Sequence, residues 1–180
     1  MALIPTVNTL LGVLTVVAQA MVVLTVLALL TKNKLDASKK WLALLGGHAF
    51  LVSFSVAFIA TTGSLFFSEV AGYNPCKLCW YQRIFMYPQV IILWLAWKKQ
   101  DFSVALTTLV LSIIGGVIAL YHYLLQIGLA PELSCSTVGY SASCSERFIM
   151  QFGYITIPLM AFSAFALILA AFAAQHASKK

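Results

Sequence analysis

The residues with the most evident chemistry are two cysteines at the start of a long apolar run. Cys76 and Cys79 form a C-x-x-C pair in the stretch NPCKLCWYQRIFMY, and Arg83 follows one helical turn later. Asn74 suits a helix N-cap and Pro75 suits the first helical position, so both cysteines are expected in the first turns of a helix. Unpaired backbone N–H groups at a helix start favour a thiolate over a thiol. The pair is therefore a candidate for thiol chemistry.

Arg83 is expected on the same side of this helix as the two cysteines. Spacings of three and four residues place Cys76, Cys79 and Arg83 on roughly one helix face. At a rise of about 1.5 Å per residue, Arg83 lies roughly 6 Å deeper than Cys79. Burying an arginine in a membrane costs about 2.5–3.5 kcal/mol on insertion scales, so such a residue marks a candidate functional site. The alternative is that Arg83 only extends its side chain to the membrane surface.

Two further cysteines lie in a loop of small polar residues. Cys135 and Cys144 have eight residues between them. A disulfide across such a loop would be accessible to the thiolate of another protein. No histidine or carboxylate pattern completes a zinc site around the four thiols, so we expect no metal. A four-cysteine zinc site and two purely structural disulfides are the alternatives, and four cysteines permit three pairings.

The composition is that of a membrane protein. Of 180 residues, 62% are hydrophobic and 9% are charged, and the mean hydropathy is +0.96. A core of this size cannot enclose so much apolar surface, so lipid must solvate it. The net charge is +6, but the basic residues cluster between apolar runs as orientation signals do. This distribution argues against a nucleic-acid partner.

Five apolar runs are long enough to span a bilayer. They cover residues 6–30, 41–67, 80–97, 102–128 and 152–174, and the longest loop covers 129–151. The first run exceeds the core of a signal peptide, so it is read as a retained helix rather than a cleaved signal. The third run is expected to bend near Pro88. The pairs Gly46–Gly47 and Gly115–Gly116 are expected to let helices pack closely.

The positive-inside rule orients the five predicted helices. Of the two alternating sets of loops, one holds eight basic residues and the other holds three. The larger set is Lys32, Lys34, Lys39, Lys40, Lys98, Lys99, Lys179 and Lys180, and the smaller set is Lys77, Arg83 and Arg147. The larger set is expected in the cytoplasm, with the N-terminus outside and the C-terminus inside. All four cysteines then fall on the outer side, where disulfides persist.

Two cysteine pairs on one side of a membrane suggest a relay of electrons. Electrons would enter at Cys135 and Cys144, pass to Cys76 and Cys79, and leave to an acceptor beside Arg83. That acceptor must dissolve in the membrane, and a quinone, which takes up two electrons and two protons, fits this requirement. Arg83 would donate a hydrogen bond to a quinone oxygen and stabilise the Cys79 thiolate.

His122 is expected at the level of the cysteines, near the outer end of the fourth run. In one interpretation it contacts the acceptor or handles its protons. In the other it is an interfacial histidine without a role in the reaction.

These motifs resemble those of a known family. The segments CKLCWYQR at 76–83, HYLLQ at 122–126 and SCSERFIMQFGYITIP at 143–158 are similar to bacterial disulfide-bond formation protein B (DsbB), in its short-loop, BdbC-like form. The similarity extends over about residues 41–174. It implies a four-helix transmembrane bundle at 41–180 that transfers electrons to ubiquinone or menaquinone. It also implies a plasma-membrane enzyme that reoxidises a DsbA-like thioredoxin-fold oxidase outside the membrane.

The resemblance also implies roles for individual residues. Cys135 would form the mixed disulfide with the partner, and Cys144 would be its mate. Cys76 would receive electrons from the loop. Contact with the quinone is implied for Cys79, Arg83 and His122.

The chain departs from the family pattern in two respects. The loop cysteines lie close together, whereas the best-known members space them widely. The first helix, within residues 1–40, lies outside the four-helix pattern, and the resemblance gives it no role.

Two other classes of protein compete with this interpretation. A vitamin K epoxide reductase-like oxidase also combines loop cysteines with a C-x-x-C pair, but its loop pair precedes that motif, whereas here the loop pair follows it. A non-catalytic membrane scaffold would hold static disulfides or a metal.

Overall fold

The computed structural model describes residues 3–99, 104–131 and 143–179, and the regular structure in these segments is helical. The elements are α1 (Leu3–Thr31), α2 (Asp36–Gly47), α3 (Ala49–Leu65) with the π-helical turn η1 (Phe66–Val70), α4 (Lys77–Lys99), α5 (Ala105–Gln126) and α6 (Ile157–Ser178). By length and composition, α1, α3 with η1, α5 and α6 can each cross a membrane. The prediction of an all-α membrane protein is confirmed.

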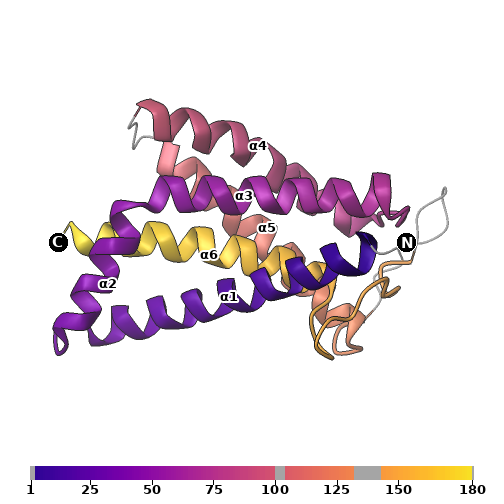
Figure 1. Ribbon diagram of the computed structural model, residues 1–180, viewed down its shortest axis with the longest axis horizontal. Coiled ribbons are helices and arrows are strands. Elements are labelled where there is room, and N and C mark those ends of the chain that lie inside the picture. Colours follow the sequence, from indigo (N-terminus) through magenta and orange to yellow (C-terminus); the bar gives the residue numbers. More distant parts are fainter. Residues whose placement is uncertain (1–2, 100–103, 132–142, 180) are drawn as a thin grey trace.

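Helix α4 is about as long as three of these four spans, but it is more polar. Its 23 residues include Gln82, Arg83 and Gln89, which lower its hydropathy. It packs against both α3 and α5, so it runs alongside two candidate spans (Figure 1). This position supports the prediction that α4 is a fifth span.

The predicted second helix, 41–67, is wrong in one respect, because the chain turns at His48. Helix α2 ends at Gly47, and the backbone of His48 (φ −108°, ψ 16°) leaves the helical region before α3 begins. Two consecutive glycines weaken a helix at this point. Figure 1 shows α2 lying across one end of the bundle, between α1 and α3.

The core of the bundle is centred on α6, which packs against α1, α2, α3 and α5. Phe165 is fully buried, and a Cβ atom at Gly115 of α5 would collide with its ring. A Cβ at Gly46 would come within 2.8 Å of the Gln175 backbone. The predicted close packing is thus confirmed at Gly115 and Gly46, whereas a Cβ at Gly47 would meet nothing within 4 Å.

The two ends of the bundle differ in the residues they carry. The N-terminus and the segment 143–156 lie at one end, and α2 and the C-terminus lie at the other (Figure 1). The start of α4, with its cysteines, lies at the first end, and the lysines of the α1–α2 turn lie at the second. The structure therefore separates the cysteines from these lysines, and which end faces the cytoplasm stays a prediction.

Candidate functional site

Helix α4 begins two residues later than predicted, so Pro75 is not its first helical residue. The carbonyl of Cys76 accepts a hydrogen bond from the Trp80 N–H at 3.1 Å, which makes Cys76 the N-cap residue in place of Asn74. Cys79 lies in the first turn. The two cysteines thus flank the helix start rather than both lying within the helix.

Aromatic packing holds the segment before α4. Gly72 adopts a positive φ of 71°, which turns the chain after η1. Tyr73 then stacks on Phe67 at 6.0 Å and on Phe148 at 5.1 Å between ring centroids. These contacts fix the non-helical residues that precede Cys76.

The two sulfur atoms are poised to form a bond. The Cys76 thiol donates a hydrogen bond to the Cys79 Sγ, and the sulfurs are 3.4 Å apart. A disulfide needs about 2.05 Å, so a small movement would close it. The hydrogen bond to Cys79 and burial raise the pKa of Cys76 to about 12. The expected thiolate is therefore wrong for Cys76, because as a buried donor it holds its proton.

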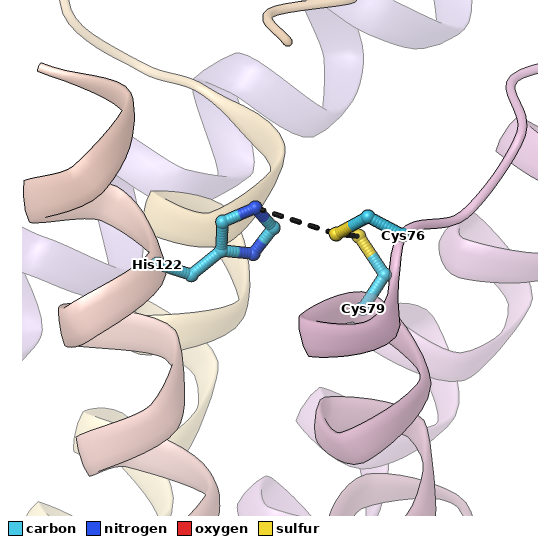
Figure 2. Close-up of side chains that lie close together, drawn as sticks. All are labelled: Cys76, Cys79 and His122. Atoms are coloured by element: carbon cyan, nitrogen blue, oxygen red, sulfur yellow. Dashed lines mark hydrogen bonds between the residues drawn. The ribbon is translucent and has the colours of Figure 1, made fainter. Parts of the chain in front are cut away.

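His122 of α5 faces this pair, as Figure 2 shows. Its Nε2 atom lies 3.6 Å from Cys76 Sγ and 3.0 Å from the carbonyl oxygen of Cys144. Its Nδ1 atom lies 2.9 Å from the Gln82 Nε2. A ring with its proton on Nε2 satisfies these contacts, because it donates to Cys144 and accepts from Gln82. The ring is 1% exposed, and its predicted position at the level of the cysteines is confirmed.

Three of these side chains form a set of candidate metal ligands. The Sγ atoms of Cys76 and Cys79 and a ring nitrogen of His122 all lie within 4.8 Å of one another. Two thiolates and an imidazole suit a zinc-type cation. The sequence did not reveal this set because His122 follows Cys79 by more than forty residues.

A small cavity of about 20 Å³ lies on the His122 side of the cysteines. Cys76, Cys79, His122 and Gln126 line it together with residues of the segment 143–158. Gln126 donates a hydrogen bond from Nε2 to the Glu146 carbonyl at 2.8 Å, which ties that segment to α5. The segment thereby brings Cys144, 3% exposed, into one buried cluster with Cys76.

A larger cavity of about 260 Å³ lies on the other side of Cys79. Cys79, Gln82 and Arg83 line it near the start of α4, and the rest of its wall is mostly apolar. The wall comes from α1, α3, α4 and α6 and from the segments next to η1 and α6. Cys79 therefore lines both cavities, whereas Cys76 and His122 line only the smaller one.

Arg83 is held in the wall of the larger cavity. Its Nε donates to the Ser64 hydroxyl and its Nη2 to the Ser64 carbonyl, both at 3.0 Å. The Tyr87 hydroxyl donates to the Ser64 hydroxyl oxygen at 3.1 Å. The guanidinium carbon of Arg83 lies 5.1 Å from the centroid of the Trp80 ring. Arg83 is thus fixed to α3 rather than extended freely to the surface. Within the described segments its Nη1 has no hydrogen-bond partner and remains a donor for a ligand.

The structure brings together most of the predicted site residues. Cys76, Cys79 and His122 line the smaller cavity, Cys144 is buried in one cluster with Cys76, and Arg83 lies in the wall of the larger cavity. Cys135 lies outside the described residues. His122 does not line the larger cavity, so its predicted contact with a quinone stays a prediction.

Several supporting residues escaped the sequence interpretation. Gln82 orients His122, Ser64 and Tyr87 hold Arg83, and Gln126 anchors the loop. Their common signal is a polar side chain inside an apolar run, which usually has a buried partner in a membrane protein.

Comparisons with known proteins show which family this chain resembles. The family model described as disulfide bond formation protein DsbB matches residues 46–175. The disulfide bond formation protein C of Bacillus subtilis (strain 168) is 45% identical over 122 residues, which cover 65% of this chain and 84% of that protein. The probable disulfide formation protein C of Halalkalibacterium halodurans is 46% identical over 123 residues, which cover 66% and 85% of the two chains.

The probable disulfide formation protein C of Bacillus cereus is 43% identical over 118 residues, which cover 66% of this chain and 84% of that protein. No solved structure matches the chain significantly. The family match spans α3, α4, α5 and most of α6, and it includes all four cysteines, Arg83 and His122. The chain therefore belongs to the DsbB family of disulfide bond formation proteins, and within it to the BdbC-like members.

Proposed function

We propose that this protein is a membrane thiol:quinone oxidoreductase. In this proposal Cys135 and Cys144 take electrons from a DsbA-like, thioredoxin-fold oxidase outside the membrane. They pass them to Cys76 and Cys79, which transfer them to ubiquinone or menaquinone. The family supports the coarser part, a membrane oxidoreductase of disulfide bond formation. The quinone, the partner and the roles of the residues are the proposal.

The observation that carries the proposal is the position of Cys79 between the two cavities. On one side it is 3.4 Å from Cys76, which lies near His122 and Cys144. On the other side it faces an apolar cavity that holds Arg83. A cysteine in this position connects thiol exchange in the loop with an acceptor dissolved in lipid.

Thiol exchange on the loop side conserves electrons and sulfur bonds. A loop thiolate attacks Cys76 in the Cys76–Cys79 disulfide and releases the Cys79 thiolate. The second loop thiol then attacks the mixed disulfide, which forms the loop disulfide and releases Cys76. Two electrons now reside on the Cys76–Cys79 dithiol, and Cys76 takes up a proton.

His122 is suited to move that proton. Cys76 holds its proton strongly, with a pKa of about 12, and the nearest ring nitrogen lies 3.6 Å away. When the sulfur–sulfur bond reforms, Nε2 can take this proton in the tautomer whose own proton is on Nδ1, with the Gln82 amide turned so that its oxygen accepts from Nδ1. Gln82 keeps the ring in place from the other side.

The larger cavity fits a quinone in chemistry and position. A bound quinone supplies an acceptor of two electrons and two protons. Arg83 offers the unpartnered Nη1 donors, and Ser64 prevents the guanidinium from moving away. A charge-assisted hydrogen bond from arginine suits an oxygen that becomes negative on reduction. The apolar remainder of the cavity suits a lipid-soluble molecule.

The proposal is tested with purified protein in nanodiscs, a reduced thioredoxin-fold oxidase and a quinone. Loss of quinone absorbance should match the partner thiols oxidised, and Cys135→Ser should abolish partner oxidation while quinone stays bound. Arg83→Ala should raise the quinone concentration needed for half-maximal rate. Arg147→Ala is the matched control, because Arg147 is exposed and outside the cavity.

Three results would contradict the proposal. Absence of quinone reduction by accessible thiols would favour a non-catalytic scaffold. Stoichiometric zinc in the resting protein would favour a metal centre at Cys76, Cys79 and His122. Labelling of the reduced cysteines by an impermeant reagent from the cytoplasmic side alone would overturn the orientation.

A further inference from the structure

Helix α1 forms one side of the larger cavity, although it lies outside the family match at 46–175. Leu11, Leu14, Thr15, Ala18 and Met21 of α1 line the cavity. They face Val56, Ala60 and Gly63 of α3 and Met160, Ala164 and Leu167 of α6. Without α1, the space between α3 and α6 would be a groove open to lipid.

Specific contacts fix α1 over this groove. Gln19 donates from Nε2 to the Ser163 hydroxyl of α6 at 3.2 Å and accepts from the Tyr154 hydroxyl at 3.0 Å. A Cβ atom at Gly63 of α3 would lie 3.1 Å from the Leu11 side chain, so α1 and α3 approach closely there. Helix α1 is therefore attached to both walls of the groove and to the turn that precedes α6.

The part of the cavity wall that α1 forms is longer than a quinone ring. From Leu11 to Met21, α1 rises about 15 Å at 1.5 Å per residue, and Ile157 to Leu167 on α6 span the same number of residues. Cys79, Gln82 and Arg83 belong to the start of α4, whereas the hydroxyls of Thr15 and Ser163, in the α1 and α6 walls, donate to backbone carbonyls of their own helices. The part of the cavity that α1 encloses is thus an apolar extension of the space beside Cys79.

We infer that α1 forms the binding site for the isoprenoid tail of the quinone, with Leu14, Ala18 and Met21 in contact with it. This inference rests on the proposed function, because it requires a quinone ring beside Cys79 and Arg83. A hydrocarbon tail attached to that ring must leave the polar end of the cavity through apolar space. The α1 side chains then determine which tails are bound, and α1 adds tail recognition to the four-helix catalytic unit.

Photoaffinity labelling tests this contact independently of turnover. The probe is a long-tailed quinone with a diazirine at the end of its tail, added to the full-length protein in nanodiscs. Mass spectrometry should find adducts on α1 within residues 11–21, and excess unlabelled long-tailed quinone should suppress them. A diazirine on the ring should label residues near Cys79 instead.

Two substitutions on α1 form a matched pair. Ala18→Phe places a ring in the cavity and should lower the amount of long-tailed quinone retained by purified protein about tenfold. Ala20→Phe adds the same group two residues away, at an exposed position outside the cavity, and should leave retention unchanged. Leu14→Ala adds no bulk and serves as a second variant in case Ala18→Phe fails to fold. It should weaken the retention of long-tailed quinone several-fold. Ala20→Phe should also leave the reduction of a tail-less quinone unchanged.

The outcomes separate this inference from the proposed function. Adducts on α1 that excess quinone does not suppress would mean that a lipid acyl chain occupies the site, and would overturn the inference. Equal retention of long-tailed quinone by Ala18→Phe, Leu14→Ala and the wild type would also overturn it, while tail-less quinone would still be reduced. If the wild type reduced no quinone at all, the proposed function itself would fail.

Discussion

The two sides of Cys79 differ in size, polarity and in the helices that build them. The smaller cavity, about 20 Å³, lies between the start of α4, α5 and the segment 143–158, and it contains His122. The larger cavity, about 260 Å³, is formed mainly by α1, α3, α4 and α6, is largely apolar and contains Arg83. No residue of α5 lines the larger cavity among the described residues, and none of α1 lines the smaller one.

This difference indicates a division of tasks. The smaller side offers what thiol exchange needs: two adjacent sulfurs, a histidine within reach of one of them, and little space for water. The larger side offers what a lipid-soluble acceptor needs: apolar volume and a fixed cation. Substitutions on the two sides should therefore change different kinetic parameters.

The largest effect is expected from Cys79, which belongs to both sides. Cys79→Ser should lower quinone-coupled turnover by on the order of 10³-fold or more, as removal of a nucleophile does. Stopped-flow loss of quinone absorbance measures this rate. Cys76→Ser should be equally inactive, but its remaining Cys79 should react with an apolar maleimide that enters the larger cavity. If Cys79→Ser retained turnover, electrons would leave through another residue.

Substitution of His122 should change the thiol chemistry at the smaller cavity and leave quinone binding in the larger cavity unchanged. His122→Ala should slow reoxidation of the Cys76–Cys79 dithiol roughly 10²-fold, as loss of a general base does. Below the Cys76 pKa of about 12, the variant's rate should rise with pH, because a growing fraction of Cys76 loses its proton to solvent. A rate–pH profile from neutral to alkaline pH checks this slope.

The control for this variant is His48→Ala, an exposed histidine at the opposite end of the bundle. It should leave both rate and profile unchanged. A His122→Ala profile identical to the wild type would remove His122 from the proton transfer.

Substitution of Ser64 should weaken quinone binding in the larger cavity, with a smaller effect than the substitutions of Cys79 and His122. Ser64→Ala removes one of the two hydrogen bonds that fix Arg83, while the bond to the backbone carbonyl remains. The loss of one bond is worth about 1 kcal/mol, so KM for quinone should rise about fivefold at constant kcat. Thr62→Ala is the control, because that hydroxyl bonds only to carbonyls of its own helix. If Ser64→Ala instead increased KM for the protein partner, the division of tasks between the two cavities would be contradicted.

Gly115 should mainly change stability. A Cβ at this position would collide with Phe165, so Gly115→Ala should destabilise the protein by about 1–3 kcal/mol through overpacking. Gly116→Ala should be nearly neutral, because its Cβ would meet Phe165 at an ordinary 3.5 Å. Thermal unfolding in detergent compares the two. Because Phe165 lines the larger cavity, its displacement by Gly115→Ala should also raise KM for quinone, whereas Gly116→Ala should not. Equal melting temperatures of the two variants would contradict the packing.

Much of the architecture follows from the sequence because the bilayer restricts the possibilities. Apolar runs of membrane-spanning length predict the helices, and the placement of the cysteines and His122 near run ends predicts that they meet at one end. The turn at His48 was not predicted, because the run from 41 to 67 is long enough for a single helix and its glycine pair was interpreted as a site of close packing. It depends on how closely α2 packs against α6 at Gly46.

The site itself was predicted as a set of residues but not as two compartments. Spacing placed Cys79 and Arg83 on one face, yet the attachment of Arg83 to Ser64 joins two different helices. The contribution of α1 to the larger cavity depends on helix packing, which its apolar sequence does not specify. The low pKa expected at a helix start was wrong for Cys76, because burial and the hydrogen bond to Cys79 act in the opposite direction.

The central claim is that Cys76 and Cys79, without the loop cysteines, deliver electrons through Cys79 to a quinone in the larger cavity. The most direct test uses a Cys135→Ser/Cys144→Ser double variant, reduced without oxygen in nanodiscs and mixed with a single addition of quinone. One quinone should be reduced for each Cys76–Cys79 disulfide that mass spectrometry then detects. Persistence of both thiols in the presence of excess quinone, although an apolar reagent alkylates Cys79, would contradict the claim.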